Sequence, residues 1–170
     1  MERGWLGGLS DGTPCGRGST MANTKAVREW LPKIAAKYGI RSVNDAGAGD
    51  MHWIRHVDWD VEYAGYDLIP RHQDVKQWDI AINPLPKADA ILCRFVIGHL
   101  DPLNAAAAIG NFRMSGSTYL IASNPTNPDP ASDLYGTFNK WDLRAAPFDL
   151  GAPLESIYDT TEHNICLWKL

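Results

Sequence analysis

One glycine-containing turn constrains the fold of this 170-residue chain more than any other segment. A short β-prone run ends at Asp45, and Gly47 and Gly49 follow with one small residue between them. Asp50 then opens an apolar stretch at helical spacing, which predicts a helix over residues 50–57. Strand, glycine turn and helix in this order indicate a ligand loop, because glycine has no Cβ to keep a ligand from the backbone. A plain turn is the alternative interpretation.

The charge of this turn separates two classes of ligand. A dinucleotide loop carries the pattern G-x-G-x-x-G, but His52 stands at the third glycine position. Asp50 would also repel a pyrophosphate at a helix N-terminus, where anions otherwise bind. Asp45 and Asp50 instead favour a cationic ligand, such as an ammonium or a sulfonium group.

Strands and helices alternate in the rest of the predicted secondary structure, which favours an α/β fold with a mostly parallel sheet. Helices are predicted over residues 23–38, where Asn23 or Thr24 can cap the start, and over residues 101–113. Pro32 lies inside the first helical pattern and predicts a kink or a break.

The predicted strands end in an antiparallel hairpin. They cover residues 41–46, 61–66, 88–97 and 117–123, and the hairpin covers residues 154–160 and 164–170. Residues 68–77 leave little room for a crossover helix, so the fold is trimmed between the second and fourth strands. Residues 78–80 are predicted as a vestigial strand or an extended loop, and residues 124–139 as a long polar loop, either a lid or simple disorder.

Candidate functional side chains follow the predicted strands. Asp67 ends the second strand, where a carboxylate can accept hydrogen bonds from ribose hydroxyls, although a turn or helix-cap role is the alternative. Asp79 could meet the exocyclic amine of an adenine, with Trp78 or Ile80 against the ring face. His99 follows the most apolar strand and suits a general base near neutral pH, or else packs against the next helix.

Composition predicts one domain, at residues 21–170, behind a flexible arm at residues 1–20 that is rich in Gly, Ser and Thr. The net charge of −4 gives no general field to attract nucleic acid, and no apolar run is long enough to span a membrane. Cys15, Cys93 and Cys166 lack metal-ligand spacing and are predicted to be free thiols of a cytoplasmic protein. Nothing in the sequence specifies an oligomeric state.

The chain resembles the class I S-adenosylmethionine-dependent methyltransferases, whose motif I is the D-x-G-x-G pattern of Asp45, Gly47 and Gly49. More specifically, residues 16–170 are similar to a family of small methyltransferase-like proteins of bacteria and their phages. The local signatures include Gly18-Ser19-Thr20, Gly65-Tyr66-Asp67, Cys93-Arg94 with His99-Leu100, and the ending Leu167-Trp168-Lys169-Leu170. The resemblance implies a Rossmann-like sandwich whose sheet ends in the predicted hairpin.

The resemblance also implies S-adenosylmethionine as the cofactor. Gly47 and Gly49 would lie under its methionine part, with Asp45 near its amino group. Ser19 and Thr20 would belong to an N-terminal segment that folds over it. Together with the residues argued above, the candidate cofactor contacts are Ser19, Thr20, Asp45, Gly47, Gly49, Asp50, Asp67, Trp78, Asp79, Ile80 and Arg94.

Two departures from similar sequences affect the predicted chemistry. Phe95 stands where an acidic residue is often found, so His99 becomes the candidate base, and Asn139 stands near the position of an arginine. The N-P-P-[YFW] tetrad of enzymes that methylate flipped DNA bases does not follow the central strand. The acceptor is therefore predicted to be a small molecule or a glycan, and nucleic acid is disfavoured.

Two further hypotheses remain open at this point. One is a non-catalytic module that binds S-adenosylmethionine or a partner on a trimmed methyltransferase fold, which Phe95 and the short crossover favour. The other is a nicotinamide-dependent oxidoreductase, against which His52 argues.

Overall fold

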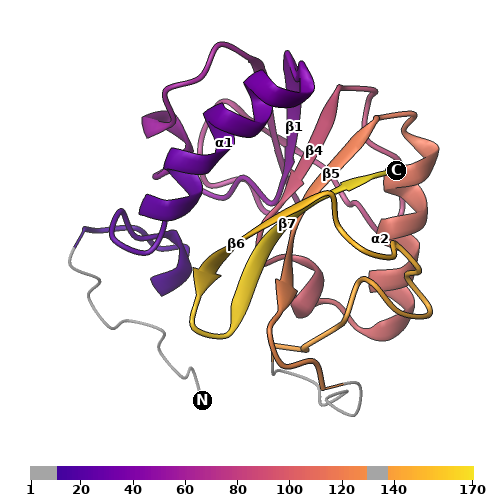
Figure 1. Ribbon diagram of the computed structural model, residues 1–170. Helices are drawn as coiled ribbons and strands as arrows, with labels where there is room; N and C mark the ends of the chain where they lie inside the picture. Colours follow the sequence, from indigo (N-terminus) through magenta and orange to yellow (C-terminus); the bar gives the residue numbers. More distant parts are fainter. Residues whose placement is uncertain (1–10, 130–137) are drawn as a thin grey trace, which may run out of the picture.

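The computed structural model describes residues 11–129 and 138–170, and in this part seven strands form one mixed sheet (Figure 1). The strand order is β3-β2-β1-β4-β5-β7-β6. Neighbours from β3 to β5 run parallel, while β7 is antiparallel to both β5 and β6. The strands are β1 (Ser42–Ala46), β2 (Glu62–Asp67), β3 (Val75–Gln77), β4 (Ala90–Cys93), β5 (Tyr119–Pro125), β6 (Glu155–Thr160) and β7 (His163–Lys169). The predicted parallel sheet with a C-terminal hairpin is confirmed.

Two α-helices and three short 3-10 turns complete the described secondary structure. They are η1 (Arg17–Ser19), α1 (Lys25–Tyr38), η2 (Ile54–His56), η3 (Ile97–His99) and α2 (Pro102–Met114). No helix in the described residues is long and apolar enough to cross a membrane.

Helix α1 covers one face of the sheet because its apolar residues recur at helical spacing. Val27 and Leu31 are fully buried in a core that also contains Trp53. Gly39 ends the helix in the left-handed region with φ 65°, and its N–H donates to the carbonyl oxygen of Ala35. The helix runs through Pro32 without interruption, so the predicted break is wrong. Burial of the apolar stripe offsets the one backbone hydrogen bond that proline cannot make.

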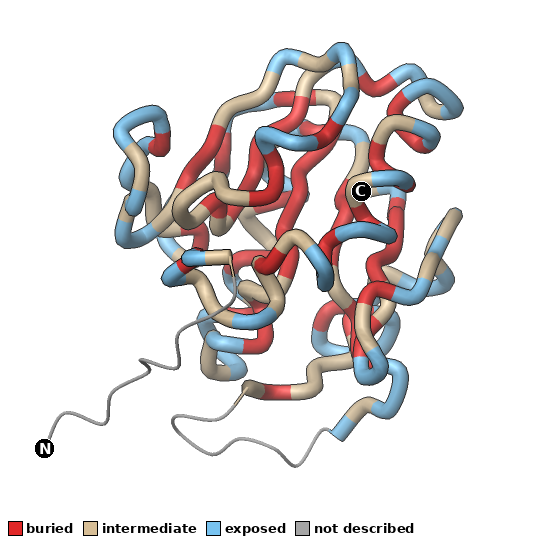
Figure 2. The backbone as a smooth tube through the Cα atoms, turned by 90° about the vertical axis from the view of Figure 1, so that its left-hand side faces the viewer, coloured by how far each residue is buried: buried red, intermediate tan, exposed pale blue. Residues whose placement is uncertain are grey.

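Helix α2 covers the opposite face and begins as predicted. The carboxylate of Asp101 accepts hydrogen bonds from the N–H groups of Leu103 and Asn104, and Pro102 occupies the first turn. Phe112 is fully buried against the sheet. Figure 2 shows that the most buried stretches of the chain gather along the central strands, between the two helical layers.

The predicted helix over residues 50–57 is wrong. Only η2 forms there, after Gly49 and Met51 adopt left-handed backbone angles, with φ 56° and 57°. These angles are incompatible with a right-handed helix beginning at Asp50. The apolar side chains of Trp53 and Ile54 still reach the core, because a single 3-10 turn is enough to bury them.

The trimmed connection is confirmed, although its strand lies elsewhere than predicted. No helix links β2 to β3, and β3 precedes residues 78–80 instead of containing them. Strand β4 is also shorter than the predicted residues 88–97, because Phe95 turns the chain with φ 57° and η3 follows. Of the predicted polar loop, the first residues continue β5, and residues 130–137 lie outside the described part.

Candidate functional site

The strand order reverses between β1 and β4, and the carboxyl ends of the parallel strands meet beside this point. In open α/β sheets, ligands bind in the crevice outside the strand ends at such a reversal. Three segments converge here: the glycine loop after β1, the turn after β4, and the arm formed by residues 11–20.

The glycine loop (residues 47–49) folds back on β2. The N–H groups of Gly47 and Ala48 both donate to the carbonyl oxygen of Tyr66, at 2.7 and 3.1 Å. Gly47 has φ 103°, and a Cβ added there would lie 2.1 Å from Cγ2 of Val96. A Cβ added at Gly49 would lie 2.7 Å from the sulfur of Cys15. Both glycines are therefore required for close approach as well as for backbone conformation.

Asp67 joins the glycine loop to the connection after β2. Its Oδ2 accepts a hydrogen bond from the N–H of Gly49, and its Oδ1 accepts one from the N–H of Ile69, each at 2.9 Å. The turn role and the ligand role considered for this residue are thus compatible, because a carboxylate has about four acceptor sites.

The two acidic residues at the ends of this turn have different environments. Asp45 is buried and accepts a hydrogen bond of 2.7 Å from the hydroxyl of Tyr63. Burial raises the pKa of Asp45 to about 7, against the opposing effect of the Tyr63 hydrogen bond. Asp50 is partly exposed and accepts hydrogen bonds from the hydroxyl of Thr13 and the N–H of His52.

The first described residues of the arm lie on the glycine loop. Oδ2 of Asp11 accepts a hydrogen bond of 2.6 Å from the N–H of Met21 and lies 3.5 Å from Nε2 of His52. The hydroxyl of Thr13 donates to Asp50 at 2.9 Å, and the sulfur of Cys15 covers Gly49.

The two predicted arm contacts, Ser19 and Thr20, hydrogen-bond within the arm itself. The hydroxyl of Ser19 donates to the carbonyl oxygen of Cys15 at 3.4 Å. The hydroxyl of Thr20 donates to the carbonyl oxygen of Arg17 at 3.1 Å. Their visible role is to shape the arm.

Arg94 anchors the arm to the terminal hairpin. Its Nε and Nη2 both donate to the carboxylate of Asp159 at 2.9 Å, and Nη1 donates to the carbonyl oxygen of Gly18 at 2.7 Å. Both side chains of the ion pair are almost fully buried. Sequence reasoning did not identify Asp159, although a charge within an apolar strand pattern signals a buried partner.

The predicted adenine contacts are partly brought together. The N–H of Trp78 donates to the carbonyl oxygen of Asp67 at 2.8 Å, and the indole packs edge-to-face on Tyr66. Oδ1 of Asp79 accepts a hydrogen bond from the N–H of Ala81. Ile80 is buried in the core beneath α2, and Trp78 packs against the same hydrophobic cluster.

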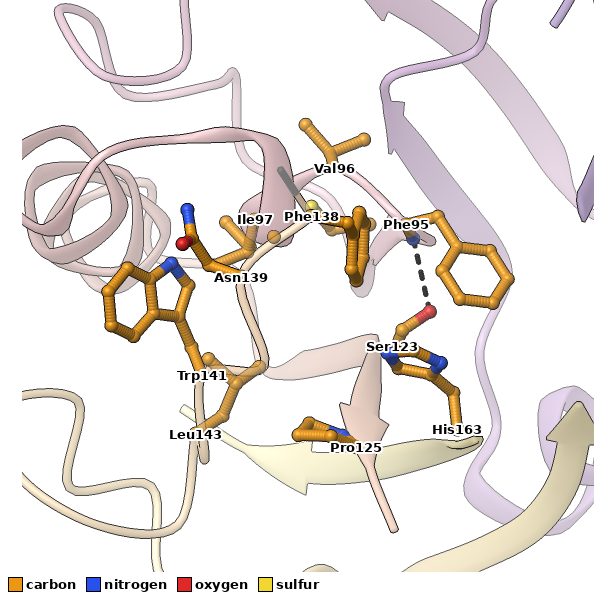
Figure 3. Close-up of a pocket in the computed structure, with 12 residues that line it drawn as sticks. Phe95, Val96, Ile97, Ser123, Pro125, Phe138, Asn139, Trp141, Leu143 and His163 are labelled. Carbon is orange, nitrogen blue, oxygen red and sulfur yellow. Dashed lines mark hydrogen bonds between the residues drawn. The ribbon is translucent and has the colours of Figure 1, made fainter. Parts of the chain in front are cut away.

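His99 belongs to a cluster of four rings at the ends of β4, β5 and β7. Figure 3 shows the other three rings, those of Phe95, Phe138 and His163. The ring centroid of Phe138 lies 5.8 Å from that of Phe95, 4.9 Å from that of His99 and 5.2 Å from that of His163. Each of these pairs is edge-to-face. The apolar surroundings lower the pKa of His99, so its imidazole is neutral, and able to accept a proton, at neutral pH.

Sequence reasoning missed His163, which opens β7 in the interior of the cluster. The residue is 6% exposed, and within the described residues its Nε2 has no hydrogen-bond partner. Burial lowers its pKa, which favours the neutral imidazole. A histidine at the end of a predicted hairpin turn gives no sequence signal of this environment.

Within the described part of the chain, no group of three or more His, Cys, Asp or Glu side chains could hold a metal ion. Cys15, Cys93 and Cys166 are free thiols, as predicted, and Cys15 is only partly buried.

No family model and no curated protein matches this sequence. Among solved structures, the magnesium protoporphyrin IX methyltransferase of Synechocystis PCC 6803 with bound S-adenosylmethionine has a TM-score of 0.60 at 15% identity, covering 87% of this chain and 80% of that chain. The 1,6-didemethyltoxoflavin-N1-methyltransferase of Burkholderia thailandensis has a TM-score of 0.61 at 14% identity, covering 89% and 79%.

A sugar N-methyltransferase of a Streptoalloteichus species has a TM-score of 0.50 at 22% identity, covering 72% of this chain and 55% of that chain. At such identities the likeness establishes the fold. The chain has the fold of the class I S-adenosylmethionine-dependent methyltransferases, as its sequence predicted.

Proposed function

We propose that this protein is an S-adenosylmethionine-dependent methyltransferase that acts on a small molecule or a glycan. The observation that carries the proposal is the glycine loop, which lies at the strand-order reversal with the carboxylates of Asp45, Asp50 and Asp67 around it. Carboxylates suit a ligand that carries an ammonium, a sulfonium and two ribose hydroxyls. They do not suit a pyrophosphate.

The residues present fit this cofactor. Gly47 and Gly49 would allow its methionine part to lie close to the backbone, and Asp45 would face the amino group. Asp67 would accept hydrogen bonds from the ribose, while Trp78 and Asp79 would border the adenine. The arm covers Gly49, so it must move aside for the cofactor to enter and can close over it afterwards.

When bound, the cofactor supplies a methyl group on a sulfonium centre that is already reactive. The protein then has to align the acceptor, exclude water and remove a proton. For a hydroxyl acceptor, His99 is the proposed base, because its lowered pKa keeps the imidazole neutral and free to take that proton.

The structural neighbours and the net charge support the proposed acceptor class. The neighbours named above are methyltransferases of a porphyrin, a toxoflavin precursor and a sugar. The net charge of −4 offers no general attraction for nucleic acid. The free cysteines favour a cytoplasmic location in a bacterial or phage-infected cell.

Calorimetric titration with S-adenosylmethionine and S-adenosylhomocysteine, with NAD as the control, tests the proposal. We expect micromolar binding of both sulfur ligands, or about −8 kcal/mol, and no binding of NAD. Asp67→Ala should weaken binding by about 1–3 kcal/mol, because ribose hydroxyls lose their acceptor. Asp74→Ala, a matched change in the exposed part of the same connection, should leave binding unaltered. No heat with either sulfur ligand would contradict the proposal.

The alternative is a non-catalytic module that binds S-adenosylmethionine or a partner. It is favoured by Phe95, which fills the strand end with an aromatic ring in place of an acid. Turnover of S-adenosylmethionine to S-adenosylhomocysteine with any acceptor would exclude the module. Binding without turnover across a broad acceptor panel would support it.

A further inference from the structure

The rings of Phe95, His99 and His163 surround the ring of Phe138, and we call the space that this ring occupies the aromatic slot. The ring of Phe138 fills this slot and stands edge-to-face to all three of its walls. Figure 3 shows it beside Phe95 and His163. It also lies directly on Gly98, where an added Cβ would be 2.4 Å from Cζ of Phe138. The glycine thus makes room for a ring at this position, and the slot is shaped for a planar aromatic group.

A phenyl ring satisfies the shape of the slot but not its polarity. His163 and Asn139 both line the cavity next to Phe138, which has a volume of about 10 Å³, the space of roughly one water molecule. They are 6% and 7% exposed. Within the described residues, Nε2 of His163 and Oδ1 of Asn139 have no hydrogen-bond partner. Buried polar atoms without partners are rare and point to a missing ligand group.

The slot adjoins the glycine loop. Val96 lines the same cavity, and its Cγ2 would lie 2.1 Å from a Cβ added at Gly47. A single side chain therefore separates the aromatic slot from the place proposed for the methionine part of the cofactor. A group held in the slot would therefore lie next to that place.

We propose that the aromatic slot is the acceptor subsite and takes a planar aromatic ring that carries a hydroxyl or an amino group. In the complex the acceptor ring replaces the ring of Phe138, and its polar substituent hydrogen-bonds to Nε2 of His163. His163 is a positioning and specificity residue in this assignment. The acceptor role rests on the proposed methyltransferase function, whereas aromatic binding in the slot does not.

The test opens the slot with Phe138→Ala and compares phenol with benzene by calorimetry, without cofactor. Benzene should bind, because a ring-sized apolar space accepts it. Phenol should bind about tenfold more tightly, the effect of one buried hydrogen bond. Adding His163→Phe should abolish the preference for phenol and keep aromatic binding. Phe148→Ala, which opens a cavity elsewhere in the core, should show no preference for phenol.

A second measurement uses the unaltered chain and does not depend on the folding of a variant. Titration with phenol should shift the imidazole nuclear magnetic resonance signals of His163, while cyclohexanol, which is not planar, should not. Equal binding of phenol and benzene to Phe138→Ala, or unchanged His163 signals with phenol, would overturn the proposal. If Phe138→Ala prefers phenol to benzene but the unaltered chain does not bind S-adenosylmethionine, aromatic binding in the slot is supported and the methyltransferase function is contradicted.

Discussion

At the scale of single residues, Asp45 shows how burial prepares a carboxylate for a cationic partner. Its pKa is raised to about 7, so the free protein holds the residue partly protonated at neutral pH. A bound ammonium would favour the ionised form and release the proton. The same residue should therefore make both the stability of the free protein and the affinity for the cofactor depend on pH.

The effect of Asp45 on the free energy of unfolding has a definite direction with pH. Because the folded-state pKa of Asp45 lies above its ordinary value of 3.8, its contribution is fully present below about pH 4 and is lost as the pH rises through about 7. Between pH 5 and 8, the free energy of unfolding should fall by about 2–3 kcal/mol more in the unaltered protein than in Asp45→Asn. Urea unfolding of both proteins at the two pH values measures this difference. Identical pH dependence would contradict the raised pKa.

The ion pair of Arg94 and Asp159 makes a second prediction at this scale. Asp159→Asn leaves a buried guanidinium without its countercharge, which should lower the free energy of unfolding by about 3–5 kcal/mol. Asp142→Asn is the matched control, because it breaks a pair of 2.7 Å with Arg144 near the surface and should cost about 0–1 kcal/mol. Equal losses of unfolding free energy in the two variants would show that the buried pair of Arg94 and Asp159 contributes no more than a pair near the surface.

The candidate site was only partly predictable at the residue scale. Asp45, Gly47, Gly49 and Asp67 could be placed together because a glycine turn after one strand and an acid after the next define the same sheet edge. His163 could not, because its environment is created by rings that the chain brings in from the turn after β4 and from the segment before Trp141. Such contacts depend on tertiary packing and have no local sequence pattern.

At the scale of elements, the arm and the glycine loop act on one another through Gly49. An alanine there would be strained at φ 56° and would also meet the sulfur of Cys15 at 2.7 Å. We expect Gly49→Ala to lift the arm and loosen the backbone around Arg17, which is already exposed, so that trypsin cleaves there faster.

Gly151→Ala provides the control for this prediction, because Gly151 has φ 67° but open space around its missing Cβ. It should cost about 1–2 kcal/mol of stability from backbone strain alone and leave cleavage at Arg17 unchanged. If the double variant Gly49→Ala/Cys15→Gly is cleaved by trypsin at Arg17 no faster than the unaltered chain, the contact with the sulfur of Cys15 is the cause. If trypsin treats Gly49→Ala and the unaltered chain alike, the arm does not depend on this contact.

Most elements were predictable, since α1, α2 and the strands carry their own periodicity and end signals. The helix predicted over residues 50–57 does not form, for a physical reason. After two left-handed residues, a single 3-10 turn buries the apolar side chains as well as a helix of the same spacing would. The shortening of β4 has a similar origin, because apolar residues after Cys93 line the turn and the core as well as they would a strand.

At the scale of the whole molecule, a bound cofactor should stabilise the entire chain, because a ligand that binds only the folded state shifts the unfolding equilibrium. At a concentration one hundred times the dissociation constant, the gain is about 2.7 kcal/mol. For a domain of this size we expect the melting temperature to rise by about 5–10 °C. Calorimetric melting with S-adenosylhomocysteine checks this, and NAD should have no effect. A melting temperature that neither S-adenosylhomocysteine nor NAD raises would contradict S-adenosylmethionine as the cofactor.

The position of Asp159 also sets an order of events during synthesis. The arm emerges from the ribosome first, yet its anchor, Arg94, is neutralised by a carboxylate that lies in the terminal hairpin. Strand β7 fits between β5 and β6, so the sheet closes only when that hairpin has left the exit tunnel. The glycine loop should therefore stay uncovered on the nascent chain, and the arm should dock as one of the last steps of folding.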